Sequence, residues 1–225
     1  MMQSKRTLFI NARLVDPKAK TETFGSLLVE NGVILKVIHD DGVDNEDAQM
    51  VVDCGGKYLA PGIVDIGVKV CEPGERHKES FRTAGQAAAA GGVTTMVTRP
   101  DTDPTIDNPE SLEFVIRRAR EVAPVHVHPM AALTKGRMGR EMTEIGFLLD
   151  AGAVAFTDCD SVITDTKVFS RALTYAHSLG ALVIAHPQEP VLSHGAAATS
   201  GKFASLRGLP AVSASQVCNA SLSSK

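Results

Sequence analysis

The stretch "APGIVDIGVKVCEPGERHKES", residues 60–80, marks the point at which the pattern of the chain changes. An apolar run suited to a buried strand begins at Ile63, and a Pro-Gly turn and a polar loop follow it. In a parallel sheet, such a strand delivers side chains to the edge where ligands gather. The residues on offer at this edge are Gly67, Lys69 and Cys71, and glycine brings no side chain.

Downstream of this stretch, apolar strand candidates recur roughly every 30 residues, which is the length of one βα unit. They begin near Ile63, Val93, Val125, Ala153 and Ala181. This spacing predicts parallel strands joined by helical crossovers. The pattern alone leaves an open doubly wound sheet and a (β/α)₈ barrel as alternatives.

The segments between these strands have helical patterns. Asn108 and Pro109 are a typical N-cap and first residue for the helix that "ESLEFVIRRAREV" predicts. "DTKVFSRALTYAHSLG" has one apolar stripe and ends at Gly180, a suitable residue just past a helix. Residues 194–210 are largely polar and are predicted to form a loop without a strand.

Residues 1–60 show short apolar runs without a helical period, so they are predicted to form a small β module. Asn31-Gly32 separates two of these runs and indicates a hairpin, because both residues tolerate positive φ. We therefore divide the chain into a β module, residues 1–60, and an α/β domain, residues 61–225.

Composition excludes several classes of function. The 225 residues carry 23 Lys+Arg against 26 Asp+Glu, a net charge of -3, and contain no Trp, which argues against a nucleic-acid partner. No apolar run approaches the ~20 residues that span a bilayer, so no membrane partner is expected. The four cysteines form no CxxC pair, and this favours free thiols in a cytoplasmic protein.

Two candidate metal ligands follow strands directly. Asp158 and His186 each come after an apolar run, and an Asp/His pair suits a divalent ion. A catalytic zinc needs three protein ligands, however, and two fall short. The alternative is that Asp158 caps the next segment and that His186 bonds a loop. His126 and His128 share one strand face as a metal pair would. The alternative is that they face the flanking helices or make ordinary hydrogen bonds, and His126 lies early in its strand, away from the functional end.

The order of "LAPGIVDIGVKVCEPG", "GGVTTMVTRPDTDPTIDN", "AGAVAFTDCDS" and "ALVIAHPQEP" resembles the dihydroorotase family of the amidohydrolase superfamily. The likeness runs from about Leu8 to about Ser213. It implies a zinc-dependent enzyme of pyrimidine biosynthesis that interconverts dihydroorotate and N-carbamoyl-aspartate. It also implies a (β/α)₈ barrel with a small β-sandwich made from both chain ends.

The chain departs from this family where the chemistry lies. In the family motif PG-x-x-D-x-H-x-H-x-R-x-P-G, the two metal histidines fall on Gly67 and Lys69, and the substrate-binding arginine falls on Cys71. The loop after the second strand usually reads M-P-N-T-x-P. Here it begins at Arg99, and its substrate-binding asparagine is replaced by Asp101. The family's fourth- and fifth-strand metal ligands are matched by Asp158 and His186.

The resemblance therefore implies a divergent member that lacks the HxH motif. We expect weak or absent zinc binding and little or no activity. Alternatives are a non-catalytic subunit that holds aspartate transcarbamoylase, or an amidohydrolase with a rebuilt one-metal site and another substrate. Five βα units do not close an eight-stranded barrel. A truncated or frameshifted chain is therefore expected, with open edges that a partner or self-association covers.

Overall fold

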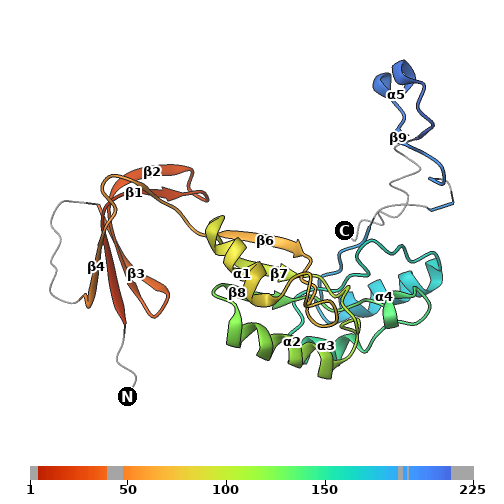
Figure 1. Ribbon diagram of the computed structural model, residues 1–225, viewed down its shortest axis with the longest axis horizontal. Coiled ribbons are helices and arrows are strands. Elements are labelled where there is room, and N and C mark those ends of the chain that lie inside the picture. The colour runs from red at the N-terminus through yellow and green to blue at the C-terminus, as the bar shows by residue number, and fades with distance from the viewer. Residues whose placement is uncertain (1–4, 40–47, 187–189, 192, 214–225) are drawn as a thin grey trace. The chain divides into compact units, whose positions relative to one another are not determined.

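The structure, a computed structural model, describes residues 5–39, 48–186, 190–191 and 193–213 (Figure 1). The chain divides into two compact units, Met1–Gly62 and Ile63–Lys225, and each is described by itself. In chain order the helices and strands are β1 (Arg6–Asp16), β2 (Thr21–Glu30), β3 (Val33–Ile38), β4 (Met50–Asp53), β5 (Tyr58–Leu59), β6 (Ile63–Val68), α1 (Phe81–Ala90), β7 (Val93–Thr98), α2 (Pro109–Val122), β8 (His126–Pro129), α3 (Ile145–Asp150), α4 (Thr166–Ser178), β9 (Ala198–Thr199), α5 (Lys202–Arg207) and β10 (Ala211–Val212).

The first unit is a sheet in the order β3-β2-β1-β4, with β5 paired to β1. β1, β2 and β3 pair antiparallel, whereas β4 and β5 run parallel to β1. The predicted hairpin is confirmed, because Asn31 (φ 50°) and Gly32 (φ 83°) join β2 to β3 in left-handed conformations. The described residues of this unit form this one sheet, and the sandwich stays a prediction.

The second unit begins with three parallel strands in chain order, β6-β7-β8. Parallel bridges then join Ala131 to Phe156 and Phe156 to Val183. Five strand segments therefore lie side by side in the order of the sequence, and the prediction of parallel βα units is confirmed. The carboxyl ends of these segments meet at one edge, which is the end where loops carry function in such folds.

Helices cover one face of this sheet. α1 contacts β7 and α2 contacts β8, as Figure 1 also shows. The predicted start of α2 is confirmed: the side chain of Asn108 accepts a hydrogen bond from the Ser111 amide, 2.9 Å, and Pro109 is the first helical residue. The core between helices and sheet is built around fully buried side chains, among them Phe81, Met96, Leu112, Val115, Ile145, Leu148 and Phe156.

The other face of the sheet is open in the part of the chain that the structure describes. The strand register puts Ile66 of β6 beside Val97 of β7, and Val97 beside His128 of β8. Val64 and Ile66 are 56% and 65% exposed on this side. The sheet therefore buries one face only, which differs from a parallel sheet covered on both sides.

Residues 194–210 correct the sequence interpretation of a strandless loop. Ala198–Thr199 and Ala211–Val212 pair in parallel as β9 and β10, and α5 lies between them. Two-residue strands and a six-residue helix are too short to leave a hydrophobic period in the sequence. Among the described residues, no helix is long and apolar enough to cross a bilayer.

Candidate site at the strand ends

Loops at the carboxyl ends of neighbouring strands bring charged side chains together. Lys69 follows β6, Arg99 follows β7, and Asp158 follows the strand segment around Phe156. The Arg99 amide donates to the Val68 carbonyl, 2.9 Å, so the pairing of the first two strands continues up to this edge. The backbone pairing of the strands therefore sets the position of the site.

Four charged side chains of these loops form one connected group, which we call the charge network: Lys69, Arg99, Asp101 and Asp160. The Lys69 Nζ lies 3.1 Å from the Asp101 Oδ2. Arg99 donates to both oxygens of Asp101, from Nε to Oδ1 at 3.2 Å and from Nη2 to Oδ2 at 3.0 Å. The same Nη2 donates to the Asp160 Oδ2 at 2.7 Å. Two positive and two negative charges therefore neutralise one another across three loops.

Burial within the charge network is uneven. The Asp101 side chain is 5% exposed and that of Arg99 is 21% exposed, whereas Lys69 is 55% and Asp160 78% exposed. The buried centre is therefore the bidentate Arg99–Asp101 pair, a geometry in which a guanidinium binds a carboxylate strongly. The exposed ends of the network are screened by solvent and contribute less.

Protonation equilibria follow this arrangement. Burial lowers the pKa of Arg99, but the hydrogen bonds to Asp160 and Asp101 raise it by more, so its pKa lies above its ordinary value. The hydrogen bond from Arg99 holds the pKa of Asp160 below its usual range, and the charges of His186 and Lys69 act in the same direction. Burial raises the pKa of the Cys159 thiol, and the Asp101 carboxylate adds to this.

Asp158 is buried, 4% exposed, and both of its oxygens are occupied. Oδ1 accepts hydrogen bonds from the backbone amides of Leu133 and Thr134, each 2.9 Å, and Oδ2 accepts from the Thr134 hydroxyl. Burial raises the pKa of Asp158, and these hydrogen bonds oppose that shift. Asp158 thus fastens the loop after β8, upstream of it in the chain, and not the next segment that the capping alternative named. Its role as a metal ligand stays a prediction.

The remaining sequence candidates are Gly67, Cys71 and His186. Gly67 has φ 95°, a conformation that favours glycine, although a side chain at this position would meet no other atom within 4 Å of its Cβ. Cys71 is half-buried with a free thiol. His186 acts electrostatically on Asp160, from the end of the fifth strand segment.

These residues do not fit a zinc ion. Gly67 offers no ligand, the Lys69 ammonium is a cation paired with Asp101, and the Asp158 oxygens already accept three hydrogen bonds. Across residues 5–39, 48–186, 190–191 and 193–213, no group of three or more His, Cys, Asp or Glu side chains is arranged to hold a metal. No catalytic step through zinc follows from this arrangement.

Sequence reasoning missed the central role of Arg99 and Asp160. Both residues stand in the quoted strand-end motifs, and each carries a charge where two loops converge. Opposite charges in consecutive strand-end loops were the available signal, because the carboxyl ends of neighbouring parallel strands lie at one edge. The ion pairs themselves could be identified only from the positions of the side chains in the structure.

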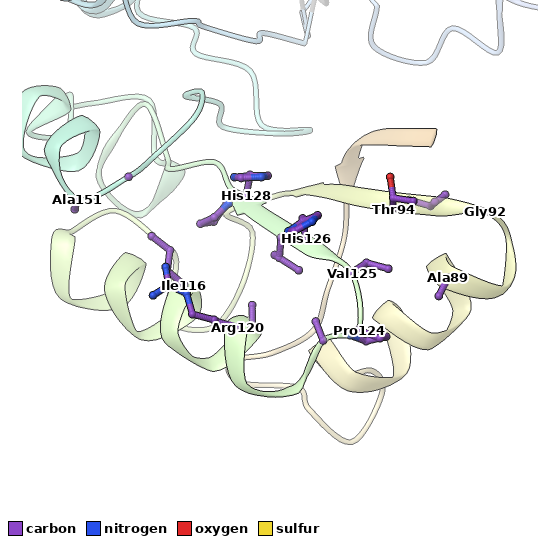
Figure 2. Close-up of a pocket in the computed structure, with 16 residues that line it drawn as sticks. Ala89, Gly92, Thr94, Ile116, Arg120, Pro124, Val125, His126, His128 and Ala151 are labelled. Carbon is purple, nitrogen blue, oxygen red and sulfur yellow. The ribbon is translucent and has the colours of Figure 1, made fainter. Parts of the chain in front are cut away.

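A cavity of about 820 Å³ lies elsewhere, along β8 near the amino ends of the strands. Figure 2 shows the imidazoles of His126 and His128 on the open side of β8, with Ile116 and Arg120 reaching in from α2. Ala151, directly after α3, also lines the cavity. Since the loops of the charge network lie at the opposite strand ends, this cavity is not part of the candidate site.

Solved structures with a similar fold are amidohydrolases. L-hydantoinase from Arthrobacter aurescens matches with a TM-score of 0.71 and 21% identity, over 83% of this chain and 41% of that chain. A D-hydantoinase matches with a TM-score of 0.68 and 21% identity, over 90% and 44%. This chain therefore shares an α/β fold with these hydantoinases.

Sequence relatives define the family. The pattern described as Dihydro-orotase-like matches residues 56–223. Dihydroorotase of Sulfurihydrogenibium sp. is 37% identical over 90% of this chain and 48% of its own length, and that of Bacillus caldolyticus is 38% identical over 82% and 43%. The chain belongs to the dihydroorotase-like family. It spans about half the length of these curated relatives.

Proposed function

We propose that this chain is a cytoplasmic, dihydroorotase-type protein of pyrimidine biosynthesis whose strand-end site turns over dihydroorotate weakly or not at all. Its five parallel strand segments are the first part of a (β/α)₈ barrel. The observation that carries the proposal is the charge network: a lysine and an arginine stand among the strand-end loops, paired with carboxylates, where the family places a zinc ion.

The charges also argue against efficient binding of the family's substrate. Dihydroorotate carries a carboxylate, which an arginine and a neutral asparagine suit. This chain has Cys71 at the arginine position and the carboxylate of Asp101 at the asparagine position. Arg99 is a cation of these loops, but its Nε and Nη2 donors already bind Asp101 and Asp160. A substrate carboxylate at Arg99 would be left with the Nη1 donors and would lie beside two aspartates.

The test measures zinc content and turnover of the same purified protein. We expect far less than one equivalent of zinc after dialysis against a mild chelator, and little hydrolysis of dihydroorotate or cyclisation of N-carbamoyl-aspartate. Bacillus caldolyticus dihydroorotase, prepared in parallel, is the positive control. A stoichiometric zinc ion with turnover in the control's range would refute the proposal. Stoichiometric metal with activity on another cyclic amide would favour the rebuilt one-metal site.

A second candidate function is that of a non-catalytic subunit that holds aspartate transcarbamoylase. Gly67 and Lys69 at the family's histidine positions favour it, since a site that has lost metal ligands leaves room for a binding role without catalysis. Size-exclusion chromatography of the two purified proteins, alone and mixed, tests this: comigration supports it, and independent elution at micromolar concentration contradicts it.

A further inference from the structure

We infer that the charge network has taken over from the metal ion the task of joining the strand ends in this chain, so that the edge of the sheet is held together by ion pairs. The inference rests on the proposed function only in that both exclude a resident zinc. It adds a specific substitute for the metal, with four named residues and two links between loops.

The first observation is that three departures from the family's motifs contact one another. Lys69 replaces a histidine, Asp101 replaces an asparagine, and Arg99 opens the second-strand motif in place of methionine. Lys69 and Arg99 both bind Asp101, at 3.0 to 3.2 Å. An unpaired charge would be costly beside a partly buried sheet edge, and here the Asp101 carboxylate compensates both cations.

The second observation is that the network links different strands. Lys69–Asp101 joins the loop after β6 to the loop after β7. Arg99–Asp160 joins the loop after β7 to the loop after the next strand segment. A divalent ion bridges strand ends by attracting anionic ligands from several loops. Here Lys69 and Arg99 together carry two positive charges, as a divalent ion does, and these charges attract the carboxylates of the neighbouring loops.

The third observation is the central position of Asp101. Its side chain is 5% exposed, and its carboxylate contacts both the Lys69 ammonium and the Arg99 guanidinium. Removing its charge leaves Lys69 and Arg99 facing each other without a carboxylate between them. The loss of stability that we expect from removing the Asp101 charge therefore depends on the presence of Lys69. This dependence distinguishes a coupled network from independent contacts.

The decisive experiment is a double-mutant cycle on Lys69→Met and Asp101→Asn in the full chain. Urea unfolding is followed by circular dichroism at 222 nm, which reports the second unit because the helices of the described chain lie there. We expect Asp101→Asn to shift the unfolding equilibrium at least about fivefold more in the wild-type background than in the Lys69→Met background. An additive cycle would overturn the inference.

An exposed ion pair of the same unit is the matched control. Lys135 and Glu141 are bonded to each other with side chains 49% and 68% exposed. The cycle on Lys135→Met and Glu141→Gln should be close to additive, because solvent screens such a pair. A coupling as large as that of the network would show that any ion pair gives the result, and would refute the specific role of Asp101.

A second measurement uses the wild-type protein and needs no variant. A ligand that binds the native state raises the thermal midpoint. We expect the midpoint to be the same with 100 μM zinc chloride as with excess chelator, whereas a rise with zinc would show that a metal still joins the strand ends. The two proposals fail separately. Turnover without a zinc shift contradicts the proposed inactivity alone, and an additive cycle in an inactive protein contradicts the network alone.

Discussion

Glu72 allows the firmest prediction, because its side chain is buried and every contact is defined. It follows Cys71 in the loop between β6 and α1 and is 4% exposed. Its Oε2 accepts a hydrogen bond from the Phe81 amide, 2.9 Å, and its Oε1 accepts from the Arg118 Nε, 2.9 Å. Arg76 lies 3.6 Å from Oε1. One carboxylate therefore holds the start of α1, the loop and α2 together.

We expect Glu72→Ala to destabilise the second unit by about 2–4 kcal/mol. A buried amide left without its acceptor costs about 1–3 kcal/mol. Breaking a buried ion pair costs about 3–5 kcal/mol where the remaining charge stays buried. Arg118 is 24% exposed and lies 3.9 Å from Glu121, so it reaches solvent or that carboxylate, and we reduce the second contribution accordingly.

The assay is urea unfolding followed by circular dichroism at 222 nm. Glu72→Gln should recover part of the loss, because its amide oxygen still accepts from Phe81. Glu75→Gln is the control, since its partner Lys78 is exposed and the pair lies at the surface. It should leave the midpoint nearly unchanged. A loss below about 1 kcal/mol for Glu72→Ala would show that water replaces the carboxylate and would refute this reasoning.

Three further predictions concern the strand-end site. Gly67→Ala should cost about 1–2 kcal/mol in chemical unfolding, since φ is 95° there, whereas Gly201→Ala, in extended backbone, should be nearly neutral. Asp158→Ala should cost about 2–3 kcal/mol and increase hydrogen exchange at the two amides that its Oδ1 binds; unchanged protection there would contradict the anchoring role. The pKa of Asp160 is lowered in the folded state, so its ionised carboxylate stabilises the fold above the unfolded-state pKa, and this stabilisation should be lost as pH falls through the folded-state pKa. Arg99→Met should raise the pKa of Asp160 in a carboxyl NMR titration. An unchanged titration would show that Arg99 is not the cause.

The regular elements were predictable because their signals are local. The Asn31-Gly32 hairpin, the Asn108 cap and the parallel order of the strands depend on residues close in sequence or on a regular interval, and the structure confirms them. The short elements β9, α5 and β10 were missed, since none is long enough for a period to show. The family also followed from motifs and their order along the chain, and the Dihydro-orotase-like match agrees.

The candidate site divides in the same way. The absence of a histidine at Gly67 and Lys69, and of an arginine at Cys71, can be read from the chain directly. The contacts that Lys69 and Arg99 make cannot be read from the sequence, because they depend on how three loops converge in the folded chain. Asp158 shows the same limit: its residue type suits a metal, and only its three hydrogen bonds reveal an anchoring contact.

By itself, the sequence determined the α/β class, the order of the strands and the residue types at Gly67, Lys69 and Cys71, because periodicity, caps and residue identity are properties of the chain alone. Only the tertiary structure decided that Lys69, Arg99, Asp101 and Asp160 form one neutral group and that Gly67 has a left-handed backbone. The physical reason is distance. Coulombic and hydrogen-bond energies depend on separations of a few ångströms, and folding sets these separations between residues far apart in sequence.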